Sequence, residues 1–120
     1  MVSCHIDIDP RPAPRPRVGR SGQVYMPNEY KEYVEEIRKQ ANPYFLNYSS
    51  HCPAALYINF SRNVPIKQKR YGDIDNLIKG VMDALIGYAY FDDAQIVSVT
   101  ANKFKGDSPG IDIIIDYLEE

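Results

Sequence analysis

The chain has 120 residues, 44% of them hydrophobic and 25% charged, which is enough for one hydrophobic core and predicts a single domain over residues 1–120. It has no run of roughly 20 apolar residues, so we expect no membrane span, and its first residues do not resemble a signal peptide. Cys4 and Cys52 are too few for a disulfide framework. We therefore expect a cytoplasmic protein with reduced thiols.

The net charge of −2 conceals a division along the chain. Residues 1–70 carry 11 Lys or Arg against 6 Asp or Glu, whereas residues 71–120 carry 3 against 10. A basic part that meets phosphates and an acidic part that holds cations are what a metal-dependent nuclease needs. Chance variation of charge along the chain explains this division equally well.

The first half of the chain predicts a strand, an irregular segment and a helix. Apolar and polar residues alternate over residues 2–9, which indicates a half-buried strand. Four prolines between residues 10 and 16 interrupt regular structure, and residues 24–26 form a candidate short strand. Helically spaced apolar residues then predict a helix that Asn28 caps and Pro43 ends.

The second half predicts three further strands and a second helix. Residues 54–61 alternate as a strand, and a helix begins at Asp73 or Asp75 and ends before Gly87. Residues 96–103 and 111–117 are two more strands, and the turn at residues 106–110 predicts that they form an antiparallel hairpin. This order indicates an α+β fold, a mixed β-sheet of about four main strands with two α-helices on one face.

Acidic residues gather at both ends of the second predicted helix. Asp73 and Asp75 are two residues apart, so in an extended stretch their side chains point the same way. Mg²⁺ is usually held by one or two carboxylates together with substrate phosphates. Each acid also has a structural interpretation, because Asp is a favoured N-cap and Asp92-Asp93 can be a solvated turn. Lys79 has a structural interpretation too, as an ion-pair partner of Asp75 or of Asp83.

Three ordered runs around this helix resemble the RusA family of Holliday-junction resolvases, the crossover junction endodeoxyribonucleases. They are Asp73-Ile74-Asp75-Asn76-Leu77-Ile78-Lys79, Met82-Asp83-Ala84-Leu85 and Phe91-Asp92-Asp93-Ala94-Gln95-Ile96-Val97. The similarity also includes the chain length, the early Pro/Arg-rich segment and the two final strands. It thus covers most of the chain, although only residues 73–97 are specific.

The resemblance implies a homodimer that resolves four-way junction DNA by paired symmetric phosphodiester hydrolysis in recombination and repair. It implies Mg²⁺ as the cofactor, with Mn²⁺ able to substitute. Carried over by position, Asp73, Asp75 and Asp93 are the metal-binding and catalytic aspartates, and Lys79 is the catalytic lysine.

Exposed basic residues before the acidic cluster are candidate DNA-phosphate contacts: Arg11, Arg15, Arg17, Arg20, Lys67, Lys69 and Arg70. Ordinary solubilising charge is the competing interpretation. Two other functions stay open, a metal-dependent nuclease acting on flap or single-stranded DNA, and a catalytically silent DNA-binding module.

Overall fold

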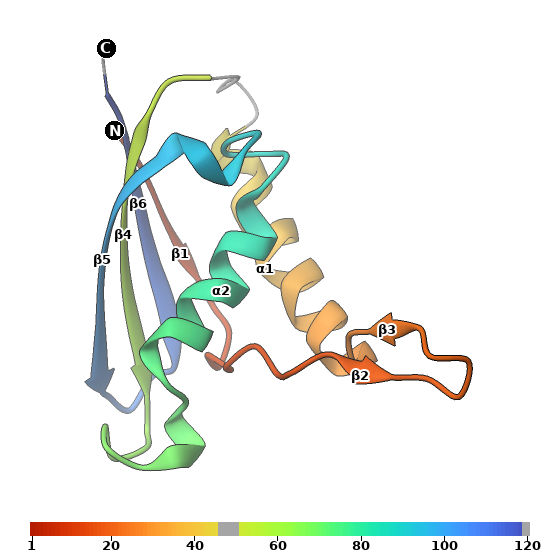
Figure 1. The fold of residues 1–120 in the computed structure, drawn as a ribbon. Helices are drawn as coiled ribbons and strands as arrows, with labels where there is room; N and C mark the ends of the chain where they lie inside the picture. Colours follow the sequence, from red (N-terminus) through yellow and green to blue (C-terminus); the bar gives the residue numbers. More distant parts are fainter. Residues whose placement is uncertain (46–50, 119–120) are drawn as a thin grey trace.

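The computed structural model describes residues 1–45 and 51–118 and has a mixed four-stranded sheet in the order β1-β6-β4-β5. Both long helices cover the same face of this sheet (Figure 1), which confirms the predicted α+β class. The sheet strands are β1 (Val2–Ile6), β4 (Ala54–Arg62), β5 (Ile96–Lys105) and β6 (Gly110–Tyr117). The helices are α1 (Asn28–Phe45) and α2 (Ile74–Leu85), with single 3₁₀ turns η1 (Lys69–Tyr71) and η2 (Asp93–Gln95).

The core lies between the sheet and the helices and follows from the alternation of apolar residues. Three neighbouring strands each contribute three buried side chains in register: Val2, Cys4 and Ile6 from β1, Ile111, Ile113 and Ile115 from β6, and Leu56, Ile58 and Phe60 from β4. Burying an aliphatic or aromatic side chain of this size contributes ~1.5–3 kcal/mol. These nine buried side chains therefore fix the strand register, since a slip of one residue would turn a strand's apolar side chains to the opposite face of the sheet.

The predicted hairpin between the last two strands is wrong. β4 lies between them, pairing parallel to β5 and antiparallel to β6. The short loop at residues 106–109 therefore crosses two strand spacings, about 10 Å. The cause is long-range: β4 buries five of its first seven residues and so takes the central position with a partner on either side.

The end predicted for the first helix is also wrong. α1 continues through Pro43 to Phe45. Proline removes a backbone donor and normally breaks a helix, but Phe45 is only 3% exposed and packs into the core. Burial of Phe45 thus holds the last turn in helical form. In the described part of the chain, neither helix is long and apolar enough to cross a bilayer.

The proline-rich segment, residues 7–16 between β1 and β2, runs across both helices to a small hairpin (Figure 1). The backbone N–H of Ala13 donates to the carbonyl of Asn76 at 2.9 Å, which attaches this segment to the first turn of α2. The hairpin, β2 (Arg17–Val18) with β3 (Val24–Tyr25), projects away from the sheet (Figure 1). The segment therefore brings basic residues to the start of α2.

Candidate active site

Two exposed carboxylates stand at the start of α2. Asp73 is the N-cap residue by backbone conformation, yet its side chain accepts no capping hydrogen bond. Asp75 lies in the first turn, and its Oδ1 accepts the backbone N–H of Asn76 at 2.9 Å. Both groups keep oxygen atoms available to a ligand, at the helix end whose dipole is positive. By donor type they suit a hard divalent cation.

Arg62, at the end of β4, holds the loop that leads into these carboxylates. Its Nη1 donates to the carbonyl oxygens of Arg70 at 2.7 Å and Tyr71 at 2.9 Å, and its guanidinium also pairs with Asp9. The Arg62 side chain is only 13% exposed, whereas that of its partner Asp9 is 45% exposed. Arg62 thus connects the proline-rich segment, β4 and the loop before Asp73.

Lys103 of β5 completes this connection. Its Nζ donates to the carbonyl of Gly72 at 2.8 Å and lies 4.7 Å from the ring centroid of Tyr71. Tyr71 is fully buried, its hydroxyl donates to the carbonyl of Phe104 at 2.7 Å, and burial raises its pKa. The peptide directly before Asp73 is therefore fixed from two strands. We call Arg62, Tyr71 and Lys103 the loop clamp.

The sequence reading missed the loop clamp. Arg62 and Lys103 lie near the ends of strands that are far apart in the sequence. Their only signal was their place at the end of a strand, because the parallel pairing that puts Phe60 opposite Lys103 is not visible locally.

The acidic doublet lies at the other end of α2, where its two members have different roles. Asp92 caps η2: its Oδ1 accepts the backbone N–H of Ala94 at 2.9 Å, and the side chain of Gln95 accepts the backbone N–H of Asp92 at 3.0 Å. Asp93 lies instead beside Tyr90. Burial raises the pKa of Tyr90, and the charge of Asp93 adds to the rise.

Within one chain the structure does not bring Asp93 to Asp73 and Asp75. η2 and the start of α2 lie at opposite ends of that helix (Figure 1), and a helix of 12 residues is about 18 Å long. Across residues 1–45 and 51–118, no three side chains of the His, Cys, Asp and Glu types form a group that could hold a metal ion. One chain thus offers two of the three predicted ligands at one place.

Lys79 lies one turn further along α2 than Asp75. Its Nζ is 3.2 Å from Oδ2 of Asp83, as one of the two sequence interpretations expected. Oδ2 of Asp83 also accepts the hydroxyl proton of Tyr30 at 2.5 Å, which links α2 to α1. The Lys79 side chain is 55% exposed, so its ammonium can turn toward a bound phosphate at little cost.

The predicted phosphate contacts flank the start of α2 from two sides, and all of them are exposed: Arg11, Arg15, Arg17, Arg20, Lys67, Lys69 and Arg70. The last three precede Asp73 in the loop that the clamp holds. The first four lie along the proline-rich segment and its hairpin. Arg62 is also basic, but its guanidinium is already bound to Asp9 and to the carbonyl oxygens of Arg70 and Tyr71.

The comparison with protein families shows to which family the chain belongs. The family model described as Endodeoxyribonuclease RusA matches residues 7–116, nearly the whole chain. This chain belongs to the RusA endodeoxyribonuclease family. A curated relative, the uncharacterized protein YqaN of Bacillus subtilis (strain 168), is 27% identical over 121 aligned residues, covering 84% of this chain and 85% of that protein. The family supports endonuclease activity on DNA.

Proposed function

We propose that this protein is a Mg²⁺-dependent endonuclease that resolves four-way DNA junctions, with Mn²⁺ able to substitute. Family membership supports cleavage of DNA. The observation that carries the proposal is the pair Asp73 and Asp75 at the start of α2. Both side chains are exposed, the Asp73 carboxylate forms no capping hydrogen bond, and two basic segments flank the pair. Recombination and repair are the processes in which such junctions arise.

We further propose that the functional unit is a homodimer in which each metal site draws on both subunits. Asp73 and Asp75 lie at the start of α2 and Asp93 lies beyond its end. A two-fold axis that pairs two α2 helices antiparallel would bring Asp93 of a second subunit to Asp73 and Asp75 of the first. The same axis would form the site twice.

The surface of α2 supports such pairing. Apolar residues recur every four positions along α2 and at its C-cap: Ile74, Ile78, Met82 and Ile86. Ile74 is 36% exposed, and the other three are only partly buried. Residues at this spacing form one ridge, the element by which helices pack against one another. Val97 and Val99 of β5, 60% and 40% exposed, add to the apolar surface that each chain leaves uncovered.

Different residues would serve different parts of the proposed phosphodiester hydrolysis. Asp73, Asp75 and the Asp93 of a second subunit would hold Mg²⁺, which when bound makes a water more acidic and neutralises charge on the phosphate. The Lys79 ammonium would place a further positive charge against the same phosphate as negative charge develops on it. The exposed arginines and lysines on either side would hold the flanking phosphates. Two symmetric sites would make the paired nicks that resolve a junction.

A substrate panel tests this function. The purified protein would be incubated with labelled four-way junction, duplex, flap and single-stranded DNA, with Mg²⁺ and with EDTA. We expect Mg²⁺-dependent, symmetric nicking of the four-way junction at least tenfold faster than of the other substrates. Faster cutting of flap or single-stranded DNA would show that the protein's function is cleavage of that substrate and not junction resolution. Binding without nicking in any metal would identify a silent DNA-binding module.

A further inference from the structure

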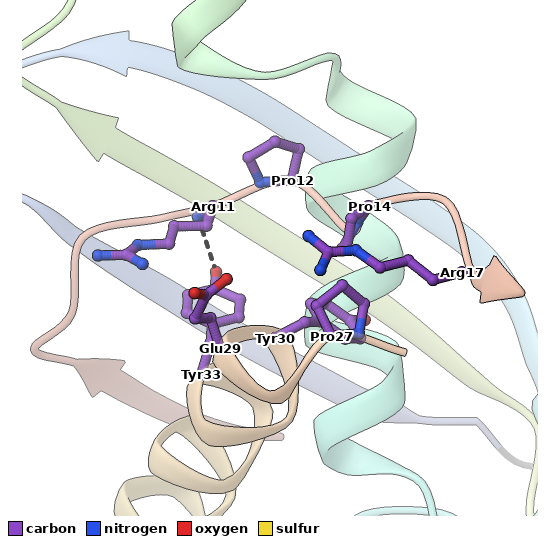
Figure 2. Close-up of a pocket in the computed structure, with 8 residues that line it drawn as sticks. All are labelled: Arg11, Pro12, Pro14, Arg17, Pro27, Glu29, Tyr30 and Tyr33. Atoms are coloured by element: carbon purple, nitrogen blue, oxygen red, sulfur yellow. Dashed lines mark hydrogen bonds between the residues drawn. The ribbon is translucent and has the colours of Figure 1, made fainter. Parts of the chain in front are cut away.

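A small hollow lies between the proline-rich segment and the first turn of α1. It has a volume of about 170 Å³. Figure 2 shows Pro12 and Pro14 along one side of the hollow and the start of α1, with Glu29 and Tyr30, along the other. A cavity of about 150 Å³ can hold a benzene molecule, so this hollow has room for one flat ring-sized group.

The floor of the hollow is rigid and aromatic. Tyr30 and Tyr33 are 7% and 5% exposed, with ring centroids 6.4 Å apart. Both hydroxyls are engaged: Tyr30 donates to Asp83, and Tyr33 accepts the backbone N–H of Arg11 at 3.1 Å. A Cβ on Gly80 of α2 would lie 3.2 Å from the Tyr33 ring, so glycine lets α2 pack directly beneath this floor.

The charges around the hollow limit what it can hold. Arg11 and Arg17 lie on its rim, and neither forms an ion pair with a residue in the described ranges. Glu29 also lines it. A carboxylate inside the hollow disfavours a phosphate there and favours a group that donates hydrogen bonds, such as the amino group of a nucleobase. The rim arginines would then take the phosphates on either side of that base.

The hollow is fixed in place relative to the acidic pair. Pro12 lines it and also contacts Gly72, where a Cβ would meet the proline ring at 3.0 Å. Ala13, the next residue, donates its N–H to the carbonyl of Asn76. The backbone on both sides of Asp73 and Asp75 thus touches the segment that walls the hollow. A strand whose phosphate lies at these aspartates would pass close to the opening.

We propose that this hollow binds one unstacked base of the DNA strand near the branch point, with the base between the tyrosine floor and the proline side and its phosphates on Arg11 and Arg17. The proposal rests on the proposed action on DNA junctions. Every base has an aromatic face, so such a site tolerates sequence while it favours DNA that is already unpaired. A branch point supplies such bases, which would help the enzyme to distinguish junctions from duplex.

An abasic scan tests the proposal. Junctions that carry a single abasic site at successive positions from the branch point would be bound in EDTA, and each dissociation constant would be measured by fluorescence anisotropy. We expect one position at which base removal weakens binding by about tenfold, the typical effect of losing one stacked base. In Arg17→Gln the same abasic site should cost less than about twofold, because the phosphate contact that positions the base over the hollow is lost.

Arg20→Gln is the matched control, because it removes the same charge from the same segment but lies outside the hollow. It should keep the full abasic penalty. A flat scan in the wild-type protein, or a full penalty that survives in Arg17→Gln, overturns the base site. If the same protein nicks intact junctions with Mg²⁺ while the scan is flat, the proposed function stands and only the base site fails. Absence of DNA binding overturns both.

Discussion

The Arg62 guanidinium donates two parallel hydrogen bonds to the Asp9 carboxylate, from Nε to Oδ1 at 3.0 Å and from Nη2 to Oδ2 at 3.1 Å. The same guanidinium holds the carbonyls of Arg70 and Tyr71. One side chain thus couples the proline-rich segment to the loop that presents Asp73. The geometry of the proposed site therefore depends on a residue that is neither a proposed metal ligand nor a proposed DNA contact.

Arg62→Ala should weaken both folding and cleavage. The loss of charge-assisted bonds at a mostly buried site predicts a fall in the free energy of unfolding of about 2 kcal/mol, measured by urea titration. Loosening of the loop should also lower kcat by about tenfold while KM changes less. Arg62→Lys should recover only part of either loss, since lysine cannot form the two-fold pair. Lys105→Ala, at the exposed end of β5, is the control. Wild-type kcat in Arg62→Ala would show that the loop clamp does not position the site.

Asp73→Asn and Asp75→Asn should each reduce Mg²⁺-dependent nicking by at least 100-fold. Junction affinity measured in EDTA should stay within about threefold of wild type, because phosphate contacts come from the basic segments rather than from the acids. Asp116→Asn, on β6, makes the same change outside the site. Either variant cutting at the wild-type rate would reject its aspartate as a ligand.

Junction affinity should fall steeply as salt is added, because each neutralised phosphate releases counterions. The logarithm of the association constant should fall linearly with the logarithm of the salt concentration. Arg15→Gln and Lys67→Gln should each make the slope shallower by about one. Lys31→Gln, on the exposed side of α1, should leave it unchanged. A slope near zero for the wild-type protein would show that these residues serve only solubility.

The protein should lose stability above about pH 9. Burial, with a smaller contribution from the charge of Asp112, raises the pKa of the Cys4 thiol to about 11. The folded state therefore keeps this thiol protonated at a pH where the unfolded chain releases the proton. Its stabilising contribution is complete below pH 9 and is lost as the pH rises to about 11, on the order of 2 kcal/mol in total.

Urea titrations at pH 8 and pH 10.5 would measure this loss. Cys4→Ala should lose less stability over the interval than wild type, and Cys52→Ala, at an exposed position, should lose as much as wild type. Burial raises the pKa of Tyr30 as well, so part of the decline should remain in Cys4→Ala. An equal loss in Cys4→Ala and wild type would contradict the assignment to Cys4.

The parts of the fold that local patterns determine were predictable. Alternation marked β1 and β4, and helical spacing marked both helices, because burial on one face imposes these periods. Strand neighbours were not predictable, because the turn at residues 106–110 indicates a reversal but not which strand lies alongside. Pro43 failed as a stop for a similar reason, since the core contact of Phe45 outweighs the local rule.

The same division holds for the candidate site. Asp73 and Asp75 could be placed together because they are two residues apart. Asp93 could not be placed, since its position depends on how α2 runs relative to β5, and the structure puts it beyond the far end of that helix. The loop clamp could not be found either, because its contacts join residues 8 to 53 positions apart.

A complementation experiment tests the shared metal site most directly. Asp73→Asn and Asp93→Asn chains with different tags would be co-expressed, the mixed dimer purified through both tags, and its Mg²⁺-dependent nicking of a four-way junction compared with that of each homodimer. If each site takes Asp73 from one subunit and Asp93 from the other, the mixed dimer has one intact site. It should therefore nick the junction although both homodimers are inactive. A mixed dimer as inactive as its parents would contradict a site built across two subunits.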